Sequence, residues 1–90
     1  MNIVVLCGEI QNDVEFNFIY NNKQVSIAKG EIILNNGDIV NIYGYDDIAD
    51  FLYQNEGKFI WVEGKVRNDG VEIKKISIWK SMENFYLSDK

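Results

Sequence analysis

The chain alternates short apolar blocks with short polar turns, which predicts strands far more than long helices. We expect five strands, over residues 2–10, 24–34, 39–45, 58–67 and 71–80. An aromatic-rich extended run over residues 14–20 lies between the first two strands. Asn36-Gly37 and Asp69-Gly70 are residue pairs typical of tight hairpin turns. Most neighbouring strands are therefore expected to be connected as hairpins.

One segment, residues 46–55, has the apolar spacing of a short amphipathic helix. Its apolar side chains share one helical face: Ile48, Phe51 and Leu52. Asp46 or Asp47 is placed to cap the first turn, where a carboxylate accepts hydrogen bonds from free backbone N–H groups. Gly57 is expected to stop the helix, because glycine adopts the left-handed conformation without a Cβ penalty.

The order of three strands, one helix and two strands predicts an all-β, five-stranded OB-fold barrel with its short helix between strands three and four. SH3-like barrels and β-grasp domains place their helices elsewhere or omit them. Gly64, inside the fourth strand, indicates a bend, a bulge or a close backbone approach. With 90 residues, the chain is expected to form one OB-fold domain over residues 1–80 and a short tail over 81–90.

Composition argues against an enzyme. The chain has no histidine and one cysteine, so the usual zinc sites and histidine-based acid–base chemistry cannot be assembled. The carboxylate pairs Asp46/Asp47 and Glu9/Asp13 fall at a helix start and around a turn, where capping and solvation explain them. We therefore predict a non-catalytic protein without cofactor or metal.

Cysteine usage and hydropathy bear on the compartment. A single cysteine cannot form an internal disulfide, which fits a reducing compartment. No stretch approaches the roughly 20 apolar residues that cross a bilayer, and the apolar run at residues 3–7 is too short for a signal peptide. We expect a cytoplasmic protein that does not bind membranes.

The net charge of −5 is unevenly distributed. Residues 1–57 contain two lysines against nine acidic residues, whereas residues 58–80 contain six basic residues against three acidic ones. A basic segment on an acidic body can supply phosphate contacts, although exposed strand positions are also commonly charged for solubility alone.

Four pieces of this pattern resemble the DNA-binding domain of bacterial single-stranded DNA-binding proteins, over about residues 2–80. The pieces are residues 2–10, then Asp13 and Glu15 before the extended run, residues 40–44 leading into Ile48-Ala49, and the segment from Gly57 to Arg67. The resemblance is to a short, tail-less member, and it implies an OB-fold that stacks bases on aromatic rings beside basic side chains. Some features of the family are missing: Gly37 stands where a tryptophan is expected, Asn17 replaces an arginine, and the last hairpin is short.

The resemblance places a stacking aromatic residue at Tyr43 and a basic residue at Arg67. Tyr45, Phe18 and Tyr20 are further aromatic candidates for base stacking. The full set of expected nucleic-acid residues is Phe18, Tyr20, Tyr43, Tyr45, Lys65, Arg67, Lys74 and Lys75. The apolar period of the last strand slips at Lys74-Lys75, which predicts a bulge that turns both lysines outward.

Alternation also predicts an apolar outer face. In an OB-fold the first and fourth strands are neighbours, and their outward positions are Ile3, Val5, Cys7, Phe59 and Trp61. A patch this apolar usually marks an interface. The resemblance implies that this face builds homo-dimers or homo-tetramers.

Two functions remain open from the sequence. One is single-stranded DNA binding in replication, recombination, repair or plasmid maintenance. The other is an OB module that has lost DNA binding and serves as a protein–protein interaction module. The missing tryptophans, the short hairpin and the acidic net charge support the second, whereas the resemblance as a whole favours the first.

Overall fold

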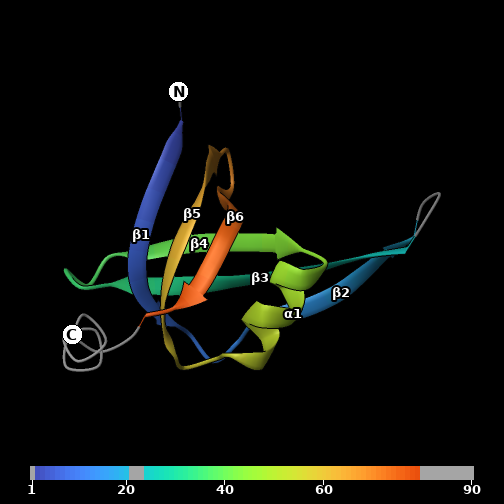
Figure 1. Cartoon of the computed structure of the whole chain (residues 1–90), viewed down its shortest axis with the longest axis horizontal. Coiled ribbons are helices and arrows are strands. Elements are labelled where there is room, and N and C mark those ends of the chain that lie inside the picture. The colour runs from blue at the N-terminus through green and yellow to red at the C-terminus, as the bar shows by residue number, and fades with distance from the viewer. Residues whose placement is uncertain (1, 21–23, 80–90) are drawn as a thin grey trace, which may run out of the picture.

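The computed structural model describes residues 2–20 and 24–79; the expected tail, 81–90, lies outside these residues. Figure 1 shows its elements: β1 (Ile3–Ile10), β2 (Glu15–Tyr20), β3 (Gln24–Leu34), β4 (Ile39–Tyr45), α1 (Asp47–Gln54), β5 (Phe59–Arg67) and β6 (Gly70–Ile78). The predicted strands and helix are present within one or two residues at each observed end. The run that we expected only to be extended is a further strand, β2.

Five of the strands close into a barrel. The order around the sheet is β1-β5-β6-β4-β3-β2, and β1 also pairs with β3, which completes the cylinder. The β4–β6 contact is the parallel one, and the other pairings are antiparallel. The helix lies between the third and fourth barrel strands, β4 and β5. This confirms the all-β OB-fold prediction.

The second strand lies outside the cylinder. It pairs in unbroken antiparallel register with the first half of β3, from Glu15 opposite Lys29 to Tyr20 opposite Gln24. The second half of β3, at Ile32–Leu34, pairs with β1 instead. We call β2 and the first half of β3 the arm, which extends away from the barrel in Figure 1.

The core fills the barrel and one of its ends. Its largest fully buried side chains are Ile10, Ile32, Ile42, Leu52, Ile60 and Val62. Leu52 and Ala49 come from α1, which packs against β3 and β4. Burying apolar area of this kind is the main favourable term in folding.

The helix ends differ in part from expectation. Asp46 is the N-cap residue, but its φ is 53° and its side chain makes no capping hydrogen bond, so the predicted carboxylate cap is wrong at this position. The Asp46 N–H donates to the carbonyl oxygen of Ser26 on the arm at 3.0 Å, which fixes the helix entry instead. Gly57 has a φ of 81°, as expected for the residue that turns the chain after the helix. Its N–H donates to the Ile10 carbonyl oxygen at 2.8 Å.

Gly64 explains how two strands approach closely. The β5–β6 register shifts between Glu63 and Gly64, and a Cβ atom at Gly64 would overlap the carbonyl oxygen of Glu72. On the β6 side Glu63 faces Lys75 while Gly64 faces Ile73, so Lys74 is the extra residue. The predicted bulge is therefore confirmed, and both lysines are exposed.

Candidate nucleic-acid interface

One row of facing positions crosses the outer surface of the whole sheet. It contains Ile3 of β1, Lys65 of β5, Glu72 of β6, Tyr43 of β4, Lys29 of β3 and Glu15 of β2. Neighbouring strands are about 4.8 Å apart, so Tyr43 and Lys65 are separated by about 10 Å across β6. An aromatic ring is thus flanked by cations on both sides, with carboxylates interspersed.

Tyr43 and Tyr45 form an aromatic pair on β4. Their ring centroids lie 6.0 Å apart and the rings are nearly perpendicular, at 88°. Tyr45 is exposed and Tyr43 is half-buried. Partial burial, followed by the nearby carboxylates of Asp69 and Glu72, raises the pKa of Tyr43 above its ordinary value of 10.0. The Tyr43 ring is therefore neutral at physiological pH and can stack on a base without adding charge.

The structure does not bring Phe18 to the same surface. Phe18 lies opposite Ser26 of β3, and Tyr45 lies opposite Ile27 of the same strand. Because successive residues of a strand point to opposite faces, Phe18 and Tyr45 lie on opposite faces of the sheet. Phe18 instead packs edge-on against Phe16 at 5.5 Å. Tyr20 ends β2, and its side chain lies outside the described part of the structure. Base stacking by these two residues stays a prediction.

The four predicted phosphate contacts come together on the β5–β6 hairpin. Lys65, Arg67, Lys74 and Lys75 are all exposed there. Lys65 and Arg67 lie on the outward side of β5, and Lys75 faces Glu63. The hairpin tip lies beside β4, because a Cβ atom at Gly70 would overlap the Asn41 carbonyl oxygen. These four cations, which we call the basic edge, are thus neighbours of the tyrosine pair.

Glu72 neutralises half of this basic edge. Its two carboxylate oxygens accept from Lys74 Nζ at 2.7 Å and from Arg67 Nε at 2.9 Å. The hydrogen bond from Lys74 is the largest cause that lowers the pKa of Glu72, and Arg67 adds to it against the opposing effect of burial. With its folded pKa below 4.5, the ionised carboxyl stabilises the native state above that pH, and this contribution is lost as pH falls through the folded pKa.

Removing this carboxylate charge should release two cations. We expect Glu72→Gln to strengthen binding of oligothymidylate about threefold at low salt and to steepen the salt dependence, because Arg67 and Lys74 then contact phosphates. The cost in stability should stay below about 1 kcal/mol for each exposed pair. Fluorescence anisotropy of a labelled oligonucleotide measures the affinity. The same loss of charge at Asp38→Asn, in the β3–β4 turn, should give a smaller increase; an equal increase would contradict a local effect.

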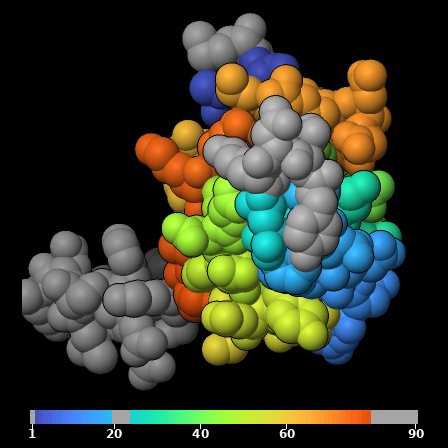
Figure 2. Space-filling model, turned by 90° about the vertical axis from the view of Figure 1, so that its right-hand side faces the viewer, coloured from blue at the N-terminus to red at the C-terminus, as the bar shows by residue number. Residues whose placement is uncertain are grey.

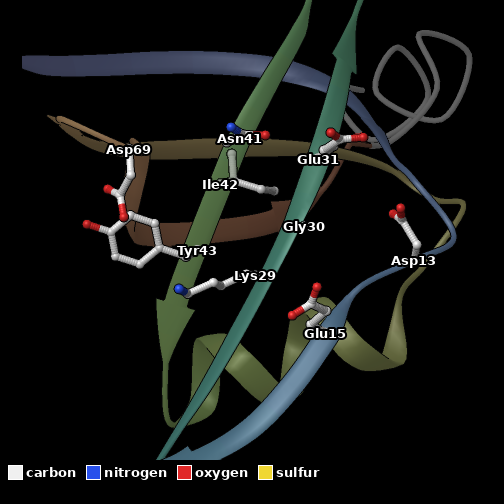
Figure 3. A pocket seen from close by; sticks show the side chains of 9 residues that line it. All are labelled: Asp13, Glu15, Lys29, Gly30, Glu31, Asn41, Ile42, Tyr43 and Asp69. Carbon is white, nitrogen blue, oxygen red and sulfur yellow. The ribbon is translucent and has the colours of Figure 1, made fainter.

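Sequence reasoning missed a groove beside Tyr43. It has a volume of about 290 Å³, and Figure 3 shows its lining: Asp13, Glu15, Lys29, Gly30, Glu31, Asn41, Ile42, Tyr43 and Asp69. We call it the acidic groove, because four carboxylates surround one lysine. The only signal in the sequence was the excess of acids in residues 1–57, which does not show where they gather.

The predicted apolar outer face is present. Ile3 and Val5 are 54% and 53% exposed, and Cys7 faces Trp61 across β1 and β5. Trp79 extends the face, because its N–H donates to the Phe59 carbonyl oxygen at 2.9 Å and the residue is half-exposed. We call these six residues the apolar patch: Ile3, Val5, Cys7, Phe59, Trp61 and Trp79.

Two kinds of feature are absent from the described residues. No group of three or more potential metal-binding side chains gathers anywhere in residues 2–20 and 24–79. Within the same ranges, no helix has the length and apolarity needed to traverse a bilayer.

Comparison with known proteins places the fold. No family model and no curated protein matches the sequence. Among solved structures, a deletion mutant of the single-stranded DNA binding protein from Thermus aquaticus superposes with a TM-score of 0.78 at 17% identity, over 90% of this chain and 42% of that one. This chain therefore spans about two fifths of that protein's length.

Two shorter solved chains match over nearly their whole length. The SSB domain of a Synechococcus protein gives a TM-score of 0.67 at 14% identity, over 84% of this chain and 93% of that one. The N-terminal domain of the PriB protein from Thermoanaerobacter tencongensis, described as dimeric, gives 0.63 at 19% identity, over 89% and 98%. At these identities the likeness concerns the fold: this chain has the OB-fold of the bacterial single-stranded DNA-binding proteins.

Proposed function

We propose that this chain is a non-catalytic, cytoplasmic single-stranded DNA-binding module that acts in DNA replication, recombination, repair or plasmid maintenance. The observation that carries the proposal is the Tyr43–Tyr45 ring pair beside the basic β5–β6 hairpin, on the outer surface of a barrel shared with single-stranded DNA-binding proteins. Stacking tolerates any base, because every base has a π-face, so this arrangement suits binding without sequence readout.

The charges predict the character of the binding. Lys65 and Lys75 are exposed cations outside the Glu72 ion pairs, and Arg67 and Lys74 can exchange Glu72 for phosphate. Each neutralised phosphate releases counterions, so the affinity should fall steeply as salt rises. The acidic groove next to Tyr43 repels the phosphate backbone of DNA. This repulsion confines a bound DNA strand to the side of the tyrosine pair that faces the β5–β6 hairpin.

A titration with oligothymidylate tests the function. We expect binding at low salt, with the logarithm of affinity falling by about 2 to 3 for each tenfold rise in salt, as for three or four phosphate contacts to a single strand. Duplex DNA of equal length is the control and should bind more weakly, because its bases are not free to stack. Absence of oligothymidylate binding at low salt would remove the proposal.

The acidic groove and the Glu72 ion pairs favour the second candidate, a module that binds proteins instead of DNA. Four carboxylates line the groove, and Arg67 and Lys74 are already paired with Glu72. This surface therefore attracts phosphate less than the surface of a basic OB module does. The oligothymidylate titration separates the two functions, because only the first requires a salt-sensitive complex.

We also propose that the apolar patch forms a homo-oligomer interface, as a dimer or tetramer. Val5 and Ile3 are more than half exposed on the side of β1 that also carries Cys7, which faces Trp61, and such a surface is stabilised by a partner that removes it from water. Val5→Glu should raise the dissociation constant of the oligomer at least about tenfold, because it buries a charge at the interface. Sedimentation velocity measures this, with Ile39→Glu, at an apolar position on β4 that is also exposed, as the matched control. An equal change in the dissociation constant for Val5→Glu and Ile39→Glu would place the interface elsewhere.

A further inference from the structure

The outer strand of the arm has an open edge. Within residues 2–20 and 24–79, β2 pairs only with β3, so its other edge faces no strand over Glu15–Tyr20. Figure 2 looks onto the end of the molecule that carries the arm and shows β2, in blue, along one margin. An open edge presents a row of backbone N–H and C=O groups that another extended chain can pair with.

This edge has little of the usual protection against such pairing. Natural edges are blunted by charged side chains, above all lysine, by proline or by a bulge, and the one charge on β2 is Glu15 at its start. The sequence of β2 is Glu-Phe-Asn-Phe-Ile-Tyr, with no lysine or proline, and its register with β3 runs without a bulge. Phe18 and Ile19 are both exposed, one on each face of the strand. An edge that is apolar, regular and open is suited to strand addition.

One face of β2 is aromatic. Phe16 contacts Phe18 at 5.5 Å and Tyr53 of α1 at 5.3 Å. Phe18 and Tyr53 are each about half exposed, so their rings present apolar area to an incoming side chain. This surface is separate from the Tyr43–Tyr45 pair, because it lies on the opposite face of the arm.

The other face of β2 carries Glu15, Asn17 and Ile19, with its one carboxylate at the start of the strand. Glu15 points to the side of the arm that carries Lys29 and lines the acidic groove together with Asp13 and Glu31. The two faces of one strand therefore differ in chemistry. An added strand, whose side chains alternate in direction, would present every second residue to the aromatic rings and the others to the face that begins with Glu15, next to the acidic groove.

We propose that β2 accepts an extended segment of a partner protein as an added strand, and that this segment alternates apolar and cationic residues. Charge complementarity selects this partner. A second copy of this chain would bring another acidic body, and a nucleic acid would bring phosphates, against the same carboxylates. Backbone hydrogen bonds supply affinity in such complexes, and the alternating side chains supply specificity. The proposal goes beyond the proposed DNA-binding function and does not depend on it.

The probe is a short blocked peptide in which lysine alternates with valine, labelled for anisotropy and titrated against the full chain. We expect binding at low salt and none by the peptide in which glutamate replaces lysine. Two further versions carry N-methyl groups on the lysines or on the valines. Strand addition uses the N–H groups of one alternate set, so one version should lose binding at least about tenfold while the other binds within about twofold of the parent.

Variants of the chain test the two faces. Glu15→Gln should weaken the peptide about threefold and Phe18→Ala about fivefold, since one removes an exposed charge and the other an aromatic contact. Asp38→Asn and Ile39→Ala are matched controls at exposed positions away from β2 and should leave the affinity unchanged. Protection of the β2 amides from hydrogen exchange on adding peptide is the independent readout.

Several outcomes would overturn this proposal. Equal binding by both N-methylated peptides would show that no strand is added. Binding unaffected by Glu15→Gln and Phe18→Ala would place the peptide elsewhere. Loss of oligothymidylate binding in Phe18→Ala would assign the arm to nucleic acid. A chain that binds the peptide but not oligothymidylate would uphold this inference while refuting the proposed DNA-binding function, so the two fail separately.

Discussion

Replacing Gly8 with alanine is expected to lower the free energy of unfolding by about 3 kcal/mol or more, a large fraction of the roughly 5–15 kcal/mol that is typical of native proteins. Gly8 is buried where β1 pairs with two strands at once, opposite Ile60 of β5 and Leu34 of β3. A Cβ atom there would overlap the Ile33 carbonyl oxygen. Backbone atoms held by pairing on both sides cannot move aside without opening the barrel.

Urea unfolding followed by tryptophan fluorescence measures this loss. Gly37→Ala is the matched control, because Gly37 has a φ of 90° and no atom within 4 Å of an added Cβ atom. It should cost only about 1 kcal/mol, the conformational penalty of a non-glycine residue in this region. A Gly8→Ala variant no less stable than Gly37→Ala would mean that β1 and β3 do not close the barrel at this point.

Tyr43→Ala is expected to weaken oligothymidylate binding between about fivefold and 150-fold, the range that corresponds to losing about 1–3 kcal/mol of stacking on one base. Tyr43 lies between Lys65 and Lys29 in the row of facing positions, directly beside Lys29, so a DNA strand bound at the β5–β6 hairpin meets its ring. Tyr43→Phe should bind nearly as well as the natural chain, because stacking uses the ring and not the hydroxyl group.

The control for this substitution is Tyr53→Ala. Tyr53 is an exposed tyrosine on α1, 55% accessible, and its ring contacts Phe16 on the aromatic side of the arm. Its loss should leave oligothymidylate binding within about twofold of the natural chain, since no stacked base is lost. If binding survives Tyr43→Ala, the DNA path lies elsewhere on the barrel.

Local patterns were enough to predict most of the fold. Hairpin turns and alternation located the barrel strands, and the position of one short helix distinguished an OB-fold from other small barrels. The slip at Lys74-Lys75 predicted the bulge, because a change of period is visible in one strand. The cap at Asp46 was wrong because a backbone hydrogen bond to Ser26, twenty residues earlier in the sequence, sets the helix entry.

The site was less predictable because it depends on register between distant segments. Asp13, Glu31 and Asp69 approach one groove from separate parts of the chain, and spacing along the sequence carries no trace of that. The capture of Arg67 and Lys74 by Glu72 also depends on side-chain positions around the bulge. Phe18 was grouped with the tyrosines by composition, and only its pairing with Ser26 shows that it faces the other way.

Because the two halves of β3 pair with different strands, the length of the arm can change without changing the size of the barrel. Barrel closure depends on Ile32–Leu34, whereas the positions nearest the tip, such as Ile19 opposite Val25, pair only within the arm. Shortening or lengthening the hairpin by facing residues would therefore change its reach and leave the cylinder dimensions as they are. Relatives with this architecture can acquire new contact surfaces by growth at the tip, without re-evolving a core.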